Sequence, residues 1–196
     1  MTKRSKRFFQ DVLEQTRQLI AEGDLTPEQR AEAEAYCANM SNVSEQDLAT
    51  YNFFFTHMPE EDDDVALIIL KGHLLVELRT REFVVERLQA PDALDAARLT
   101  SHQLICLAES LCLPNPDPKW LWSTARQLNS LRNKLAHNLE PKDLEKEIRA
   151  FTILFKGQNL AGGTLIGCIG NLYSQVAALA DISRSKEYKV RGRSAT

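Results

Sequence analysis

The apolar residues of this chain recur mostly at intervals of three and four, which is the spacing of amphipathic helices. The sequence has no alternating run of β-branched residues and no Asn-Gly or Asp-Gly pair of the kind that closes a hairpin. We therefore expect an all-α protein. Prolines, glycines and capping residues divide the pattern into helices expected at about 6–22, 27–38, 45–55, 63–89, 92–112, 118–140, 141–156 and 164–182.

An acidic run at 60–64 gives the clearest internal boundary. Acidic side chains favour the positive end of a helix, so the run predicts both the end of an N-terminal part and the start of a long helix. We expect residues 1–62 to form an N-terminal helical extension and residues 63–156 an antiparallel four-helix bundle. Residues 157–183 would add a C-terminal helix packed outside the bundle, and residues 184–196 a basic, flexible tail.

The long helix expected at 63–89 carries an apolar stripe on one face. Its members are Leu67, Leu70, Leu74, Leu78, Val85 and Leu88. Such a stripe is typical of the side of a helix that faces the core, so we expect these side chains to be buried. A polar stripe of His73, Glu77 and Arg81 lies beside it. We expect Glu77 to pair with Arg81 in water, the alternative being that it orients an arginine of the motif described below.

Composition narrows the class of protein. The net charge of −3 excludes a generally basic protein that coats nucleic acid, but it allows a local basic site. The four cysteines have neither CxxC nor zinc-ligand spacing and are expected to be buried, reduced thiols, which favours the cytoplasm. The N-terminus lacks the apolar core of a signal peptide, and no aliphatic stretch is long enough to span a bilayer, so we expect no membrane partner. The cysteines are Cys37, Cys106, Cys112 and Cys168.

The candidate chemistry lies late in the helix that precedes Pro141. Arg132 is followed by Asn133 and, five residues after the arginine, by His137. Arginine is the best planar partner for a phosphate, and histidine is the side chain most readily poised between acid and base near neutral pH. This pattern resembles the Arg-x4-6-His motif of the HEPN superfamily, a group of helical domains named for nucleotide binding in higher eukaryotes and prokaryotes. A polar residue directly after the arginine is typical of its RNA-cleaving members.

The resemblance implies a fold and a function. It covers roughly residues 63–156 and implies a homodimeric endoribonuclease that needs no metal and no cofactor. Arg132 and His137 would do the chemistry, and Asn133 would support them. We expect Arg126 and Lys134 to bind the RNA backbone nearby. Many proteins of this kind are toxins or phage-defence effectors, so an antitoxin or regulatory protein is a further expected partner.

The spacing of the motif raises a geometric question. Five residues on an ideal helix separate Arg132 from His137 by about 140°. Two solutions are open. The last turn of the helix loosens before Pro141, which disfavours helical geometry in the residue that precedes it. Alternatively, a second subunit brings its own motif across a two-fold axis and completes a composite site, as is usual in the superfamily.

The same residues also allow other interpretations. His137 could cap the end of a helix while Arg132 forms a surface ion pair. The protein would then be a non-catalytic helical module that binds a protein or a nucleotide, or a transcriptional co-regulator, although no basic recognition helix is evident. The basic residues at 3–7 and 184–193 could bind an RNA backbone or could simply be solvated.

Overall fold

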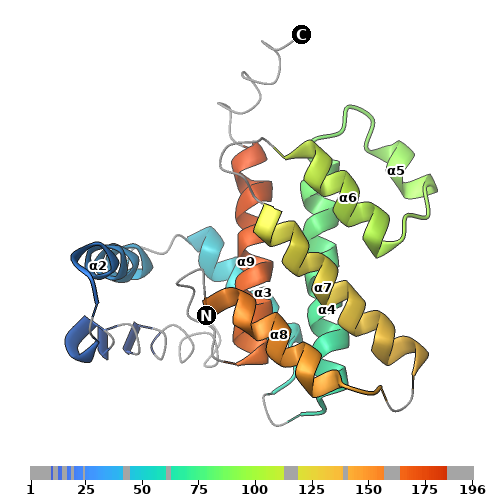
Figure 1. The fold of residues 1–196 in the computed structure, drawn as a ribbon. Helices are drawn as coiled ribbons and strands as arrows, with labels where there is room; N and C mark the ends of the chain where they lie inside the picture. The colour runs from blue at the N-terminus through green and yellow to red at the C-terminus, as the bar shows by residue number, and fades with distance from the viewer. Residues whose placement is uncertain are drawn as a thin grey trace. The chain divides into compact units, whose positions relative to one another are not determined.

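The computed structural model describes residues 10, 13–14, 17–18, 20–23, 25–41, 45–60, 63–112, 119–138, 141–156 and 164–184. All regular secondary structure in these ranges is helical (Figure 1), as the periodicity predicted. The chain divides into two compact units, residues 1–57 and residues 58–196. The helix expected at about 6–22, the first residue of the helix expected at 118–140, and most of the basic residues at both ends lie partly or wholly outside the described residues.

The first unit contains α2 (Pro27–Ser41) and α3 (Glu45–His57). Proline occupies the first position of α2, where the missing N–H costs nothing, and Glu28 follows in the first turn. The start of α2 is therefore where the sequence predicted it.

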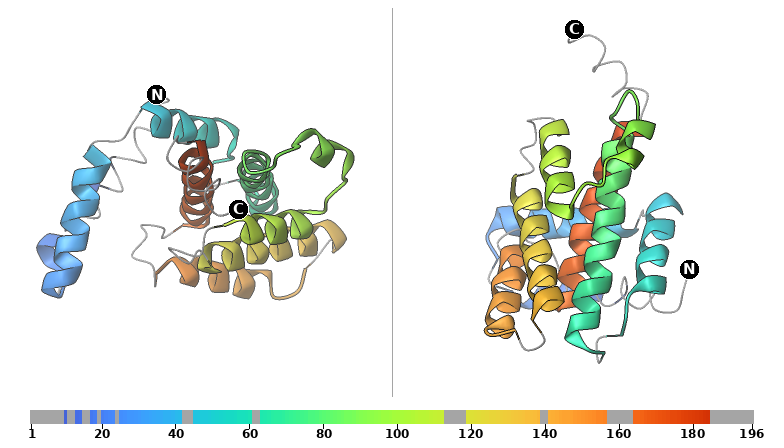
Figure 2. Two further views of the ribbon diagram at one scale, coloured as in Figure 1. Left: turned by 90° about the horizontal axis from the view of Figure 1, so that it is seen from above. Right: turned by 90° about the vertical axis from the view of Figure 1, so that its right-hand side faces the viewer.

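The second unit contains the motif. Its helices are α4 (Val65–Val85), α5 (Asp92–Ala96), α6 (Ser101–Leu111), α7 (Lys119–His137), α8 (Leu144–Lys156) and α9 (Leu165–Arg184). Figure 2 shows α4 and α9 side by side in one layer, and α6, α7 and α8 in a second layer against them. The helix α4 contacts α6, α7 and α9, so it is the central element of this unit.

Local capping sets where two of these helices begin. The Asp64 side chain accepts a hydrogen bond from the backbone N–H of Ala66 at 2.9 Å, which confirms the expected acidic start of α4. The prediction of a single helix at 92–112 is wrong, because Thr100 and Gln103 form a capping box that starts a new helix at Ser101. Two free backbone donors are satisfied there, which makes a break more favourable than a continuous helix.

The apolar stripe expected to face the core from α4 is largely exposed. Leu67, Leu74 and Leu78 have exposed fractions of 41%, 58% and 40%. The core instead receives the opposite face of the helix. Its buried members are Ile68, Ile69, Gly72, His73, Leu75, Val76, Thr80, Phe83 and Val84. Both faces of α4 are apolar enough to pack, so local periodicity alone did not distinguish them.

The C-terminal helix α9 is part of the core, and our expectation that it packs outside a bundle formed by residues 63–156 is wrong. Ile169, Leu172 and Tyr173 are fully buried, and α9 makes the most extensive helix contact of α4. The two helices approach closely at Gly72, where an added Cβ would lie 2.7 Å from Cγ2 of Ile169. Glycine permits this approach because it has no side chain.

The four cysteines differ in burial, whereas all of them were expected to be buried. Only Cys168 is buried, Cys37 and Cys112 are half-buried, and Cys106 is exposed on α6. Burial raises the pKa of the Cys168 thiol to about 11. Among the described helices, none combines the length and the apolar character that crossing a membrane requires.

Candidate functional site

The motif residues lie on α7, whose first half is anchored in the core. Trp122, Leu128 and Leu131 are fully buried, and Trp122 packs against Phe83 of α4 with ring centroids 5.6 Å apart. The helix becomes progressively more exposed toward its end. Arg132 is half-buried, whereas His137, the last residue of α7, is exposed. The core therefore holds one end of the helix and presents the other end, with the motif, to solvent (Figure 1).

The structure brings two of the three motif residues together. Nη1 of Arg132 donates a hydrogen bond to Oδ1 of Asn133 at 3.0 Å. His137 does not join them, because α7 keeps its α-helical hydrogen bonding to the end: the N–H of Asn138 donates to the Lys134 carbonyl at 3.0 Å. The last turn therefore does not loosen, and Arg132 and His137 stay on different sides of the helix.

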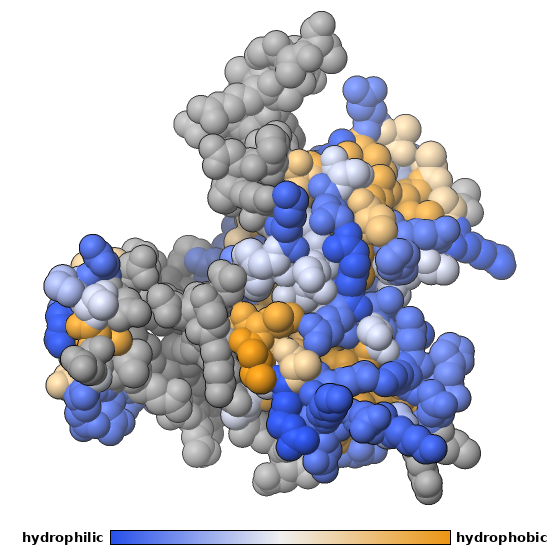
Figure 3. All heavy atoms as spheres, viewed as in Figure 1, coloured by the Kyte–Doolittle hydropathy of each residue, from blue (hydrophilic) through white to orange (hydrophobic). Residues whose placement is uncertain are grey.

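The two residues expected to bind the RNA backbone are engaged in ion pairs within the protein. Arg126 pairs with Glu109 of α6, and Lys134 pairs with Glu147 of α8. All four side chains are partly exposed, and such pairs contribute only about 0–1 kcal/mol. A phosphate could replace the carboxylates at little cost. Figure 3 shows a largely hydrophilic surface over α7 and the first part of α8, and a hydrophobic patch over the end of α8.

A buried polar network lies next to the motif, between α4, α6 and α7. Nε2 of His73 on α4 lies 3.1 Å from Oδ1 of Asn129, one turn before Arg132 on α7. A carbonyl oxygen can only accept, so the ring proton is on Nε2. Nδ1 of His73 lies 3.8 Å from a carboxylate oxygen of Glu77, which accepts a hydrogen bond from the Ser101 hydroxyl.

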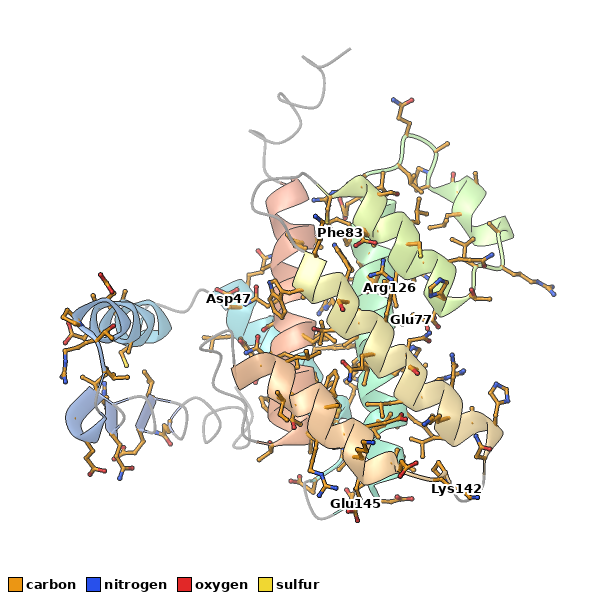
Figure 4. The ribbon with its side chains drawn as sticks, viewed as in Figure 1. Asp47, Glu77, Phe83, Arg126, Lys142 and Glu145 are labelled. Carbon is orange, nitrogen blue, oxygen red and sulfur yellow. The ribbon has the colours of Figure 1, made fainter. Side chains whose placement is uncertain are left out.

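Glu77 thus has a different role from the one its sequence position suggested. Figure 4 shows Glu77 on the side of α4 that faces α6 and α7. It is turned toward Ser101 and His73, whereas we expected it to form an exposed pair with Arg81. A small pocket at this point is lined by His73, Glu77, Thr80 and Ser101 together with apolar side chains.

The electrostatics of His73 connect this network to the motif. Burial lowers the pKa of His73, and this effect outweighs the nearby Glu77 carboxylate, which raises it. The positive charge of Arg132 lowers the pKa further, and the hydrogen bond to Asn129 raises it. In the folded protein His73 is therefore neutral at neutral pH. Nδ1 of this neutral ring is buried and, within the described part of the chain, makes no hydrogen bond.

Sequence reasoning noticed His73 and Glu77 but missed Ser101 and Asn129. The signal for Asn129 was its position between Leu128 and Leu131, because a polar residue among core positions needs a buried partner. Ser101 offered no such signal, since it reaches Glu77 only through the packing of α6 against α4.

The lowered pKa of His73 predicts a loss of stability in mild acid. The unfolded histidine binds a proton below its ordinary pKa of 6.5, whereas the folded one resists it. The free energy of unfolding should therefore fall as the pH drops below 6.5. His73→Gln keeps an amide donor for Asn129 but cannot titrate, so it should weaken this pH dependence. Urea unfolding between about pH 7.5 and 5 measures the effect.

His102→Gln is the matched control, since His102 is exposed on α6. It should retain the wild-type pH dependence. Equal slopes for wild type and His73→Gln over that range would contradict the assignment of a neutral, buried His73.

No known protein family, no curated protein and no solved structure matches this chain. Within the described residues, no group of three or more histidine, cysteine or acidic side chains is placed to hold a metal ion.

Proposed function

We propose that this protein is a metal-independent endoribonuclease of the HEPN type, with Arg132 and His137 as its catalytic residues. The observation that carries the proposal is the geometry of the end of α7. Arg132 is held by Asn133 at the half-buried edge of the helix, while His137 is exposed one turn further on. An oriented guanidinium and an accessible imidazole are the two groups that phosphodiester cleavage needs in the absence of metal.

The chemistry is an attack of the RNA on itself. A base removes the proton of a 2′-hydroxyl, the 2′-oxygen forms a bond to the adjacent phosphorus, and the bond from phosphorus to the 5′-oxygen breaks. The leaving 5′-oxygen takes up a proton, and the products carry a 2′,3′-cyclic phosphate and a 5′-hydroxyl. His137 would serve as base or acid. Arg132, oriented by Asn133, would stabilise the charge that develops on the phosphate oxygens.

The proposal includes a two-fold homodimer. Because α7 is a regular helix to its end, Arg132 and His137 of one chain are not directed at a single phosphate. Across a two-fold axis, the arginine of one subunit would serve the histidine of the other. Arg126 and Lys134 would exchange their carboxylate partners for RNA phosphates. The cellular role that we propose is a toxin or phage-defence effector, controlled by an antitoxin or another regulatory protein.

A second candidate function is a non-catalytic protein-binding module. The exposed leucines of α4 favour it, because contiguous apolar surface marks interaction sites. In this case Arg132 and Asn133 would only stabilise the end of α7.

Incubation of the purified protein with total RNA in EDTA distinguishes the two candidates. We expect cleavage to persist, because neither catalytic group depends on a metal. The new 3′ ends should resist phosphatase until acid opens the cyclic phosphate. RNA that stays intact at a high concentration of protein, with or without added divalent cations, would favour the protein-binding module.

A further inference from the structure

The polar side chains that line the pocket between α4 and α6 offer hydrogen-bond acceptors to whatever enters it. These side chains are His73, Glu77 and Thr80 of α4 and Ser101 of α6, and apolar side chains of α4, α6 and α7 form the other walls. The three α4 residues are four and three positions apart, so they lie on one face of the helix. The pocket has room for about one group of the size of a water molecule.

The protons of these polar side chains are already donated to groups of the protein. The Thr80 hydroxyl donates to a backbone carbonyl of α4 at 2.8 Å, and the Ser101 hydroxyl donates to the Glu77 carboxylate. The ring proton of His73 is on Nε2 and is donated to Asn129. Two hydroxyl oxygens, one carboxylate and Nδ1 of His73 therefore remain, and each of them has a lone pair that only a donor can satisfy.

Nδ1 of His73 is the atom that most requires a ligand. His73 is 4% exposed, and its Nδ1 is buried without a hydrogen-bond partner in the described part of the chain. A buried acceptor in this state costs free energy that a donor would recover. Glu77 is not that donor, because a carboxylate only accepts, and its Oε2 lies 3.8 Å from Nδ1. At this separation, one donor nitrogen can lie about 2.9 Å from both atoms.

The electrostatics of the pocket favour a cationic donor over a neutral one. Burial has the largest effect on the pKa of His73 and lowers it, which keeps the ring neutral and Nδ1 an acceptor. Glu77 raises the same pKa, and it does so more strongly than Arg132 lowers it. The combined field of Glu77 and Arg132 at the ring is therefore that of a negative charge, and the apolar walls strengthen its attraction for a cation.

We propose that this pocket binds an ammonium group, which is either the free ammonium ion or the charged end of a primary aliphatic amine. An ammonium group offers more donors than a water molecule and carries the charge that complements Glu77. Nδ1 of His73, a carboxylate oxygen of Glu77 and the hydroxyl oxygen of Ser101 would accept from it. Glu77 and Ser101 are only partly buried, so the ligand can enter from solvent on their side. The inference rests on the pocket alone and does not depend on RNA cleavage.

Nuclear magnetic resonance of the full-length chain tests the proposal, because the nitrogen chemical shift of Nδ1 changes when this atom accepts a hydrogen bond. We expect ammonium chloride, titrated near neutral pH at constant ionic strength, to shift the His73 signal in a saturable way, with a dissociation constant in the millimolar range. Tetramethylammonium has the same charge but no N–H donor, so it should leave the signal unchanged. Methylammonium distinguishes the two sources of the ligand. Tighter binding than that of ammonium assigns the pocket to the end of an aliphatic amine, and weaker binding assigns it to the free ion.

A charge substitution tests the role of the carboxylate. Glu77→Gln should raise the dissociation constant at least about tenfold, because a hydrogen bond to a charged group is lost. Glu86→Gln is the matched control, since it removes the same charge at the exposed C-cap of α4, outside the pocket, and should bind as wild type does. Circular dichroism verifies that each variant is folded. In the wild-type chain, no saturable response to ammonium at about 100 mM, where millimolar sites are filled, or an equal response to tetramethylammonium, would overturn the proposal. Undiminished binding by folded Glu77→Gln would do the same.

Discussion

Replacing His137 with alanine is expected to lower the rate of RNA cleavage about a hundredfold or more, which is the usual scale for a positioned acid or base. Arg132→Ala should produce a loss of similar size, because it removes the group that stabilises the charged phosphate. Neither change should unfold the protein, since both residues lie at the end of α7, outside the buried core. Gel analysis of RNA fragments over time gives the rates.

Lys142→Ala provides the matched control for charge and position. Lys142 is exposed in the segment between α7 and α8, as Figure 4 shows, and has no proposed role in catalysis. This variant should cleave RNA at the wild-type rate. If His137→Ala cleaves as fast as wild type, or loses activity only because it melts at a lower temperature, the catalytic assignment is wrong.

Mixing the two inactive variants shows whether the site is shared between subunits. In a composite site, a heterodimer of Arg132→Ala and His137→Ala chains retains one intact pair, with the arginine from one chain and the histidine from the other. Part of the activity should then return after the chains are exchanged. If both groups act within one chain, every heterodimer lacks an intact pair and no activity returns.

The second large effect is expected at Gly72, where α4 and α9 meet. Gly72→Val should lower the free energy of unfolding by about 3 kcal/mol, because overpacking of a tight contact forces neighbouring groups to move. An added Cβ already lies 2.7 Å from Cγ2 and 2.9 Å from Cδ1 of Ile169, and 3.2 Å from Cε of Met58. Urea unfolding followed by circular dichroism measures the change.

Two companion variants separate overpacking from other causes. Gly72→Ala adds one carbon and gains helix propensity of about 1 kcal/mol, so its net effect should be smaller. Ile169→Ala removes the side-chain carbons that crowd the site, so Gly72→Val should be less damaging in that background than in wild type. Strict additivity of the two substitutions would show that Gly72 is not constrained by its contact with α9.

Features of this protein that depend on neighbours within one or two helical turns could be predicted from the sequence. The helical period predicted an all-α protein, and Pro27 and Asp64 marked helix starts that the structure confirms. The motif was expected late in a helix, and α7 ends at His137, four residues before Pro141. These features depend on hydrogen bonds and steric limits between residues that are close in the chain, so local reasoning reaches them.

Which of the two apolar faces of α4 is buried depends on how the helices pack, and the sequence pattern did not predict it. Both sides of α4 carry aliphatic residues, and the face with Gly72 is buried because it lets α9 approach closely, which leaves Leu74 outside. The contacts of the candidate site also fall into a local class, which the sequence could predict, and a long-range class, which it could not. The contact between Arg132 and Asn133 joins neighbours in the chain, whereas His73 meets Asn129 across 56 positions and Glu77 meets Ser101 across 24. Contacts of that range depend on how whole helices pack, and periodicity within one helix carries no information about its partners.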